Sequence, residues 1–164
     1  MNQIVMVFWE FLSIFGSFIF WIIVTVLSVI VFLFSSKRIK KKMLWFISTV
    51  LPSVILSRFI TEIIKMIFKI SRPCIGPECP ITYSFPSGHA TVIFAAVTVI
   101  SLNYKNWRIT TLMTVFAVLV ALSRLMLGLH RLEDIFVGSI IGIIVAVLVR
   151  RTYENYQRKI KEII

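Results

Sequence analysis

Long apolar runs dominate this sequence and limit what it can fold into. They fall within residues 4–34, 43–68, 87–103, 108–127 and 132–149. A helix needs about 20 such residues to cross the hydrocarbon core of a bilayer. The chain is 59% hydrophobic, whereas soluble domains are usually about half apolar or less. We therefore expect an all-α integral membrane protein in which residues 1–164 form a single domain.

The first apolar run has 31 residues, which is too long for one straight span and too short for two. Gly16 offers a bend inside it. We expect an interfacial helix over residues 3–14 and the first span over residues 17–34. With the four later runs, the chain should form a bundle of about five transmembrane helices plus this N-terminal interfacial helix. A charged helical tail should follow from residue 150, and a cleavable signal peptide is not expected, because the start of the chain has no basic residue.

The charged residues lie between the apolar runs rather than on one soluble face. The net charge is +11, but clusters between spans indicate topology rather than a nucleic-acid partner. Positive clusters lie at residues 37–42, 104–108 and from 150 onward. They alternate with loops at residues 69–86 and 128–133, so the positive-inside rule places the clusters in the cytoplasm and these loops outside. The pattern is typical of a multi-pass protein of the cell membrane.

The outer loop over residues 71–86 holds four prolines, so it cannot be a regular helix. It also holds both cysteines of the chain, Cys74 and Cys79, with four residues between them. No third Cys or His accompanies them, so a zinc site is not expected. A small disulfide and two free thiols both remain open.

Polar residues suited to phosphate chemistry gather where the spans meet the outer loops. Lys65 and Arg72 lie at the outer end of the second span, Ser87 and Gly88 at the start of the third, and Arg124 at the end of the fourth. Guanidinium groups bind phosphate oxygens in pairs, and a helix N-terminus directs free N–H groups at an anion. Snorkelling cations and ordinary helix caps explain each feature singly, but the three groups on one face favour a binding site.

Both histidines of the chain belong to the same outer set. If a helix begins near His130, Asp134 shares its face four residues on. The carboxylate can then hold one imidazole nitrogen and leave the other free to attack. His89 is a candidate general acid. Alone, this pair would also fit a polar loop between two membrane helices.

The three groups together resemble the signature of the phosphatidic acid phosphatase type 2 superfamily. That signature reads Lys, six residues, Arg-Pro; then Pro-Ser-Gly-His; then Ser-Arg, five residues, His, three residues, Asp. The chain keeps every spacing, in Lys65 to Arg72-Pro73, Pro86-Ser87-Gly88-His89, and Ser123-Arg124 to His130 and Asp134. One departure is size, because many membrane members have six spans, whereas this chain is expected to have about five and an interfacial helix.

The resemblance implies that His130 forms a phosphohistidine, that Asp134 orients it, and that His89 protonates the leaving group and then activates water. It also implies that the phosphoryl oxygens are bound by Lys65, Arg72, Ser87, Gly88 and Arg124. The family uses no metal, so neither a metal nor a cofactor is expected. The catalytic motifs would then lie within residues 65–134 of a single phosphatase domain.

The function that this resemblance predicts is a phosphatase for a membrane lipid phosphate or pyrophosphate, with its site on the extracytoplasmic face. The outward site and small size resemble bacterial-type polyprenyl (undecaprenyl-type) pyrophosphate phosphatases. The alternative is a phosphatidylglycerophosphate or phosphatidate phosphatase. A lipid- or anion-binding protein without activity is the non-enzymatic alternative, against which the intact His89, His130 and Asp134 argue.

Arg58, Glu62 and Lys65 share one face of the second span, at spacings of four and three residues. Arg58 and Glu62 lie deeper than the motif. The sequence favours a structural ion pair between them over a role in substrate choice.

Overall fold

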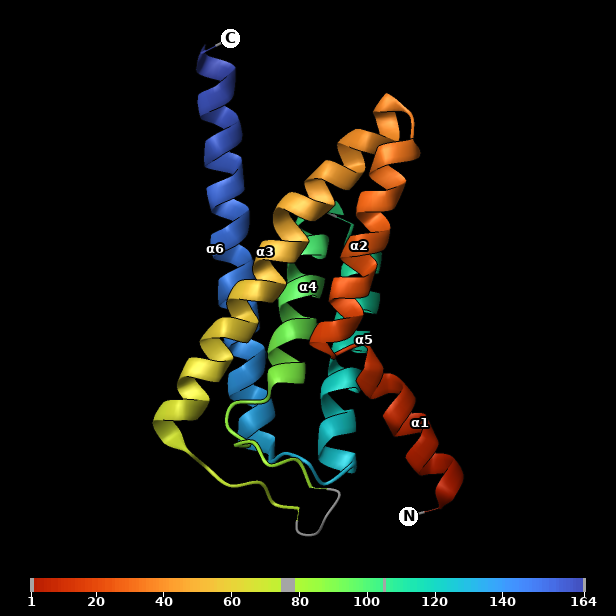
Figure 1. The fold of residues 1–164 in the computed structure, drawn as a ribbon, viewed down its shortest axis with the longest axis vertical. Helices are drawn as coiled ribbons and strands as arrows, with labels where there is room; N and C mark the ends of the chain where they lie inside the picture. The colour runs from red at the N-terminus through yellow and green to blue at the C-terminus, as the bar shows by residue number, and fades with distance from the viewer. Residues whose placement is uncertain (1, 75–78, 105, 164) are drawn as a thin grey trace.

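The computed structural model describes residues 2–74, 79–104 and 106–163, and all regular secondary structure in these ranges is helical. The helices are α1 (Gln3–Ile14), α2 (Phe18–Phe34), α3 (Lys37–Phe68), α4 (Gly88–Tyr104), α5 (Trp107–Met126) and α6 (Leu132–Ile163). Helix α4 lies inside the bundle and packs against α3, α5 and α6 (Figure 1). The prediction of an all-α membrane bundle is confirmed.

Three helices, α3, α5 and α6, are long and apolar enough to cross a membrane. Helices α1 and α2 pass the same test as a pair bent by 51°, while α4 is apolar but has only 17 residues. The bent pair corresponds to the predicted interfacial helix and first span, with the break at Gly16. The predicted second span starts earlier than expected, at Lys37, because Lys and Arg in the basic cluster are good helix formers. The predicted fifth span and charged tail form one continuous helix, α6.

The bend between α1 and α2 packs closely against the middle of the bundle. A Cβ atom added to Gly16 would lie 2.9 Å from the Cβ of His89 and 3.0 Å from Cγ1 of Val120. The indole Nε1 of Trp21 donates a hydrogen bond of 2.9 Å to the Phe15 carbonyl. The hydrogen bond joins the start of α2 to the end of α1, and Gly16 lies against both α4 and α5. Helix α1 itself packs against α5.

Two glycines allow α6 to lie directly against α4. A Cβ on Gly138 would lie 2.7 Å from the Ser87 carbonyl oxygen, and one on Gly142 would overlap the Thr91 carbonyl oxygen. Small residues spaced four apart let two membrane helices approach closely, and Gly138 and Gly142 pack against α4 in this way. This contact fixes the start of α4 relative to the start of α6.

Four helix ends meet at one end of the bundle, the lower end in Figure 1: the ends of α3 and α5 and the starts of α4 and α6. Lys69 ends α3 in the left-handed conformation, at φ 49°, and its N–H donates to the Lys65 carbonyl. Gly128, at φ 67°, turns the chain after α5, a conformation that glycine adopts without strain. These turns place the residues of the three sequence groups at the same end.

Candidate active site

The imidazole of His130 is held between a carboxylate and a guanidinium. Its Nδ1 lies 3.3 Å from Oδ2 of Asp134, in the first turn of α6. The same carboxylate oxygen accepts a hydrogen bond of 2.9 Å from the backbone N–H of Arg131. Only 3% of His130 and 2% of Asp134 is exposed. The ring therefore has one orientation, set by the start of α6.

Arg72 contacts the other ring nitrogen and is itself fixed on several sides. Its Nη1 lies 3.0 Å from Nε2 of His130 and donates to the Leu129 carbonyl at 2.9 Å. Its Nε and Nη2 donate to the carbonyl and the hydroxyl of Thr82, at 3.0 and 2.9 Å. Because a guanidinium only donates, Nε2 carries the lone pair and Nδ1 carries the proton toward Asp134. Nε2 is therefore the nucleophilic nitrogen of the ring.

The surroundings of His130 keep its imidazole neutral. Burial lowers the pKa of His130 below its ordinary value of 6.5, and the positive charges of Arg72 and Arg124 lower it further. The hydrogen bond to Asp134 raises the pKa and so opposes this effect without reversing it. At neutral pH Nε2 is consequently unprotonated, as a nucleophile requires, and its lone pair accepts from Arg72.

The start of α4 has one buried hydroxyl without a partner among the described residues. The backbone N–H of Ser87 donates to the Asp134 carbonyl at 2.9 Å, which joins α4 to α6. The Ser87 hydroxyl is buried and has no hydrogen-bond partner within the described residues. A buried polar group without a partner is destabilising, and the N-terminus of a helix attracts anions. Ser87 and Gly88 are therefore suited to hold phosphoryl oxygens.

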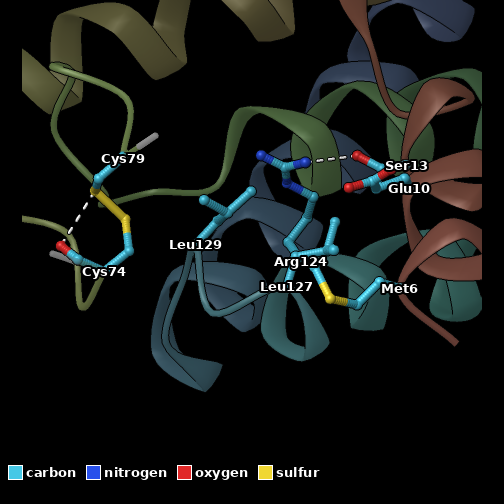
Figure 2. A pocket seen from close by; sticks show the side chains of 8 residues that line it. All are labelled: Met6, Glu10, Ser13, Cys74, Cys79, Arg124, Leu127 and Leu129. Carbon is cyan, nitrogen blue, oxygen red and sulfur yellow. Dashed lines mark hydrogen bonds between the residues drawn. A yellow bond between two sulfur atoms is a disulfide. The ribbon is translucent and has the colours of Figure 1, made fainter. Parts of the chain in front are cut away.

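Arg124, in the last turn of α5, reaches toward the N-terminal helix (Figure 2). Its Nη1 donates to the Ser13 hydroxyl of α1, while its Nε is buried without a partner among the described residues. Its backbone carbonyl accepts from the N–H groups of Leu129 and His130, at 3.1 and 3.3 Å. The backbone of Arg124 thus supports the loop between α5 and α6 that carries His130, called the histidine loop below. Part of its guanidinium remains free for an anion.

A cavity of about 420 Å³ lies in front of Arg124, between α1 and the outer loop. Its lining includes Glu10 and Ser13 of α1, Leu129, and the cysteines (Figure 2). Cys74 and Cys79 form a disulfide in the structure, the first of the two states that the sequence left open. Arg124 therefore lines a cavity that is bounded by both α1 and the outer loop.

All eight predicted site residues lie at this end of the bundle. Direct contacts join Arg72, His130, Asp134 and Ser87. His89 lies in the first turn of α4, against the α1–α2 bend. The other two side-chain cations have protein partners: Arg124 contacts Ser13, and Lys65, which is 5% exposed, lies 3.5 Å from Glu62.

Two residues outside the sequence motifs, Thr82 and Ser13, accept hydrogen bonds from Arg72 and Arg124. Thr82 lies ten residues from Arg72 in the Pro-rich loop, and nothing in the sequence distinguishes it. Ser13 and Glu10 carry a weak signal, because they are polar residues three positions apart in an otherwise apolar helix. That spacing places both on the face that meets Arg124.

This arrangement of a membrane bundle with a His–Asp pair and clustered cations defines a class of protein. The family model of the PAP2 superfamily, the phosphatidic acid phosphatase type 2 superfamily, matches residues 46–158. The chain belongs to this superfamily, and it is a multi-pass membrane protein. The resemblance stated from the sequence is confirmed.

Individual relatives agree with this assignment. The undecaprenyl-diphosphatase of Sulfolobus acidocaldarius is 30% identical over 140 residues, which cover 80% of this chain and 63% of that protein. The transmembrane PAP2-type phosphatidylglycerolphosphate phosphatase of Bacillus subtilis superposes with a TM-score of 0.79 at 22% identity, over 94% of this chain and 79% of that one. LpxE of Aquifex aeolicus gives a TM-score of 0.71 at 25% identity, over 92% and 88%. The chain thus spans just under two thirds of the length of the curated relative.

Proposed function

We propose that this chain is a lipid phosphatase that hydrolyses polyprenyl pyrophosphate through a phosphohistidine, without a metal ion. Residues 1–164 would then act as one phosphatase domain, with its catalytic motifs in residues 65–134. The observation that carries the proposal is the pair of contacts made by the His130 ring. Its Nδ1 lies 3.3 Å from Asp134 and its Nε2 lies 3.0 Å from Arg72. A neutral, oriented imidazole beside a cation is suited to attack a phosphorus atom.

The proposed reaction has two steps, formation of the phosphohistidine and its hydrolysis. In the first, Nε2 of His130 attacks the terminal phosphorus, the bond from phosphorus to the leaving oxygen breaks, and His89 supplies a proton to that oxygen where one is needed. In the second, His89 takes a proton from water, the water oxygen attacks phosphorus, and the P–N bond breaks. Where the first step has transferred no proton, His89 then releases this proton to solvent. Inorganic phosphate leaves and His130 returns to its starting form. Five groups would hold the phosphoryl oxygens: Lys65, Arg72, Ser87, Gly88 and Arg124.

The curated relative supports a diphosphate substrate, because its name is undecaprenyl-diphosphatase. Phosphatidylglycerophosphate or phosphatidate is the alternative substrate, and the same residues would act on it by the same steps. Three cations cannot lie deep in hydrocarbon, so the phosphate would bind near the interface and the lipid tail would stay among the helices.

We place the site on the extracytoplasmic face. The basic cluster at the start of α3 and the charged end of α6 lie at the other end of the bundle (Figure 1), and such clusters stay in the cytoplasm. The disulfide in the outer loop also favours an oxidising compartment. A membrane-impermeant thiol reagent, applied to intact cells after mild reduction, should label Cys74 and Cys79. Labelling that requires permeabilised cells would reverse this topology.

Phosphate release by the purified protein tests the function. The panel contains polyprenyl pyrophosphate, phosphatidylglycerophosphate, phosphatidate and a water-soluble phosphate ester, with the His130→Ala variant as the inactive control. We expect kcat/KM to be highest for polyprenyl pyrophosphate and lowest for the soluble ester, and His130→Ala to lose turnover on all four. A preference for phosphatidylglycerophosphate would move the substrate to the alternative. Substantial activity of His130→Ala would overturn the phosphohistidine mechanism.

A further inference from the structure

Arg58 is a charged residue inside a membrane helix, and its ion pair does not use the whole guanidinium. It lies on α3, about 10 Å along the helix from Lys65. Its Nη2 is 2.9 Å from Oε1 of Glu62, and 37% of its side chain is exposed. A charge within a span usually faces a polar cavity or a substrate path. The ion pair with Glu62 uses only Nη2, so the other nitrogens of the Arg58 guanidinium can have a different partner.

The second terminal nitrogen of Arg58 lies against the start of α4. A Cβ atom built on Gly88 would be 2.7 Å from Nη1 of Arg58, and no other side chain atom would come closer than Cγ2 of Thr61, at 3.6 Å. The missing side chain of Gly88 thus makes room for the guanidinium. Arg58 extends along α3 and brings its charge to the helix N-terminus that is suited to bind phosphate.

Arg58 is linked through a carboxylate to one of the residues proposed to bind phosphate. Glu62 contacts both Arg58 and Lys65, at 2.9 and 3.5 Å, so one carboxylate positions two cations. Arg58 is therefore a fourth cation beside the proposed phosphate pocket, and unlike the buried Lys65 it is partly exposed.

A diphosphate lipid needs two anion sites in sequence. The terminal phosphate must lie at His130, and the phosphate that carries the tail must lie between that point and the bilayer. Arg58 combines contact with Gly88 and exposure at the surface of a membrane helix, which are the two properties that this second position requires. We propose that Arg58 binds the phosphate that remains on the lipid, and so makes the site select diphosphate over monophosphate esters. This inference rests on the proposed phosphatase function.

The chemistry gives the two substrate types different needs. When the terminal P–O bond of a diphosphate breaks, negative charge grows on the lipid phosphate that leaves, and Arg58 would stabilise it in the transition state. When a monophosphate ester reacts, the leaving group is an alcohol, which requires the proton from His89 instead. Loss of Arg58 should therefore affect kcat as well as KM, and mainly for the diphosphate.

Matched polyprenyl diphosphate and polyprenyl monophosphate, with the same tail, test the inference on the purified full-length chain. We expect Arg58→Gln to lower kcat/KM for the diphosphate about 10- to 100-fold more than for the monophosphate, as the loss of a charge-assisted contact predicts. Arg58→Lys should keep part of the preference. Arg150→Gln is the matched control, because Arg150 forms the same kind of i,i+4 pair with Glu154, at 2.8 Å, in the second half of α6 and away from the proposed site.

Equal losses on both esters, or no loss on either, would overturn the role of Arg58. If Arg58→Gln does not fold, inhibition supplies a second measurement. Methylenediphosphonate, a diphosphate that cannot be hydrolysed, should inhibit the wild-type chain more strongly than inorganic phosphate, and Arg58→Lys should narrow that difference. An unchanged difference would contradict the inference. A wild-type chain that hydrolyses neither ester would overturn the proposed function itself, an outcome that is visible before any variant is compared.

Discussion

The two arginines that flank the histidine loop are held in different ways. Arg72 uses all three of its nitrogens, toward Thr82, the Leu129 carbonyl and His130. Arg124 donates to one hydroxyl, that of Ser13, and its Nε is buried without a partner in the described part of the chain. Arg72 therefore has a fixed position before any substrate binds, whereas the position of Arg124 depends on another helix.

This difference separates the site into two parts. Arg72 is fixed by the outer loop and the histidine loop, both of which lie within residues 46–158, the region that the superfamily model matches. Ser13 lies on α1, outside that region. The core of the site is thus built by the shared part of the fold, and one of its cations is positioned by the N-terminal helix. A preorganised donor loses little on binding, while a loosely held one must be ordered first.

The largest effects on kcat/KM should come from two separate variants, one without the charge of Arg72 and one without the charge of Arg124. We expect Arg72→Gln to lower kcat/KM about 100- to 1,000-fold, as loss of a preorganised donor to a developing charge does, and Arg124→Gln to have a smaller effect. Loss of either charge also changes the pKa of His130. Both arginines lower this pKa, and the charge of Arg72 has the larger effect. Removing either charge raises the pKa, so the acid limb of kcat/KM should move to higher pH.

The pH–rate profiles of wild type, Arg72→Gln and Arg124→Gln measure both effects. In the wild type, the acid limb of kcat/KM should lie below pH 6.5, because burial holds the pKa of His130 under that value. The upward shift should be larger in Arg72→Gln than in Arg124→Gln. A larger shift in Arg124→Gln would reverse the comparison between the two arginines.

A smaller effect should distinguish the residues that hold the arginines. Ser13→Ala removes the hydroxyl partner of Arg124, so we expect KM to rise about 3- to 10-fold with little change in kcat, and Ser13→Thr to restore the wild-type value. Thr82→Val removes one of several partners of Arg72, so its KM should change about twofold. Steady-state kinetics on one lipid substrate decides between them. An equal response to Ser13→Ala and Thr82→Val would show that the two arginines are equally well held.

The helices and the gathering of motif residues could be predicted from sequence because each rests on local information. Apolar runs define spans, and helix ends that alternate across a membrane bring Lys65, His89 and Asp134 to one side. The contacts that fix those residues could not be predicted in the same way. Ser13 and Arg124 are 111 positions apart, and the packing of α1 against α5 brings them together.

The same limit applies to Arg58. Its spacing to Glu62 predicted an ion pair, and the pair is present at 2.9 Å. The spacing carries no information about Gly88, on another helix, which meets the rest of the guanidinium. The disulfide could not be decided either, because a short separation permits closure of the Cys74–Cys79 loop without requiring it.

Helix α6 has 32 residues without a break, and so measures about 48 Å. The hydrocarbon core of a bilayer is only about 30 Å thick, so roughly a third of the helix must stand outside it. Asp134 is in the first turn of this rod, and Gly138 and Gly142 press it against α4. A membrane helix that is longer than the bilayer is thick accommodates the difference mainly by tilting. Because Asp134 lies at the start of α6, we expect the depth of the His130–Asp134 pair below the lipid headgroups to depend on the thickness of the bilayer.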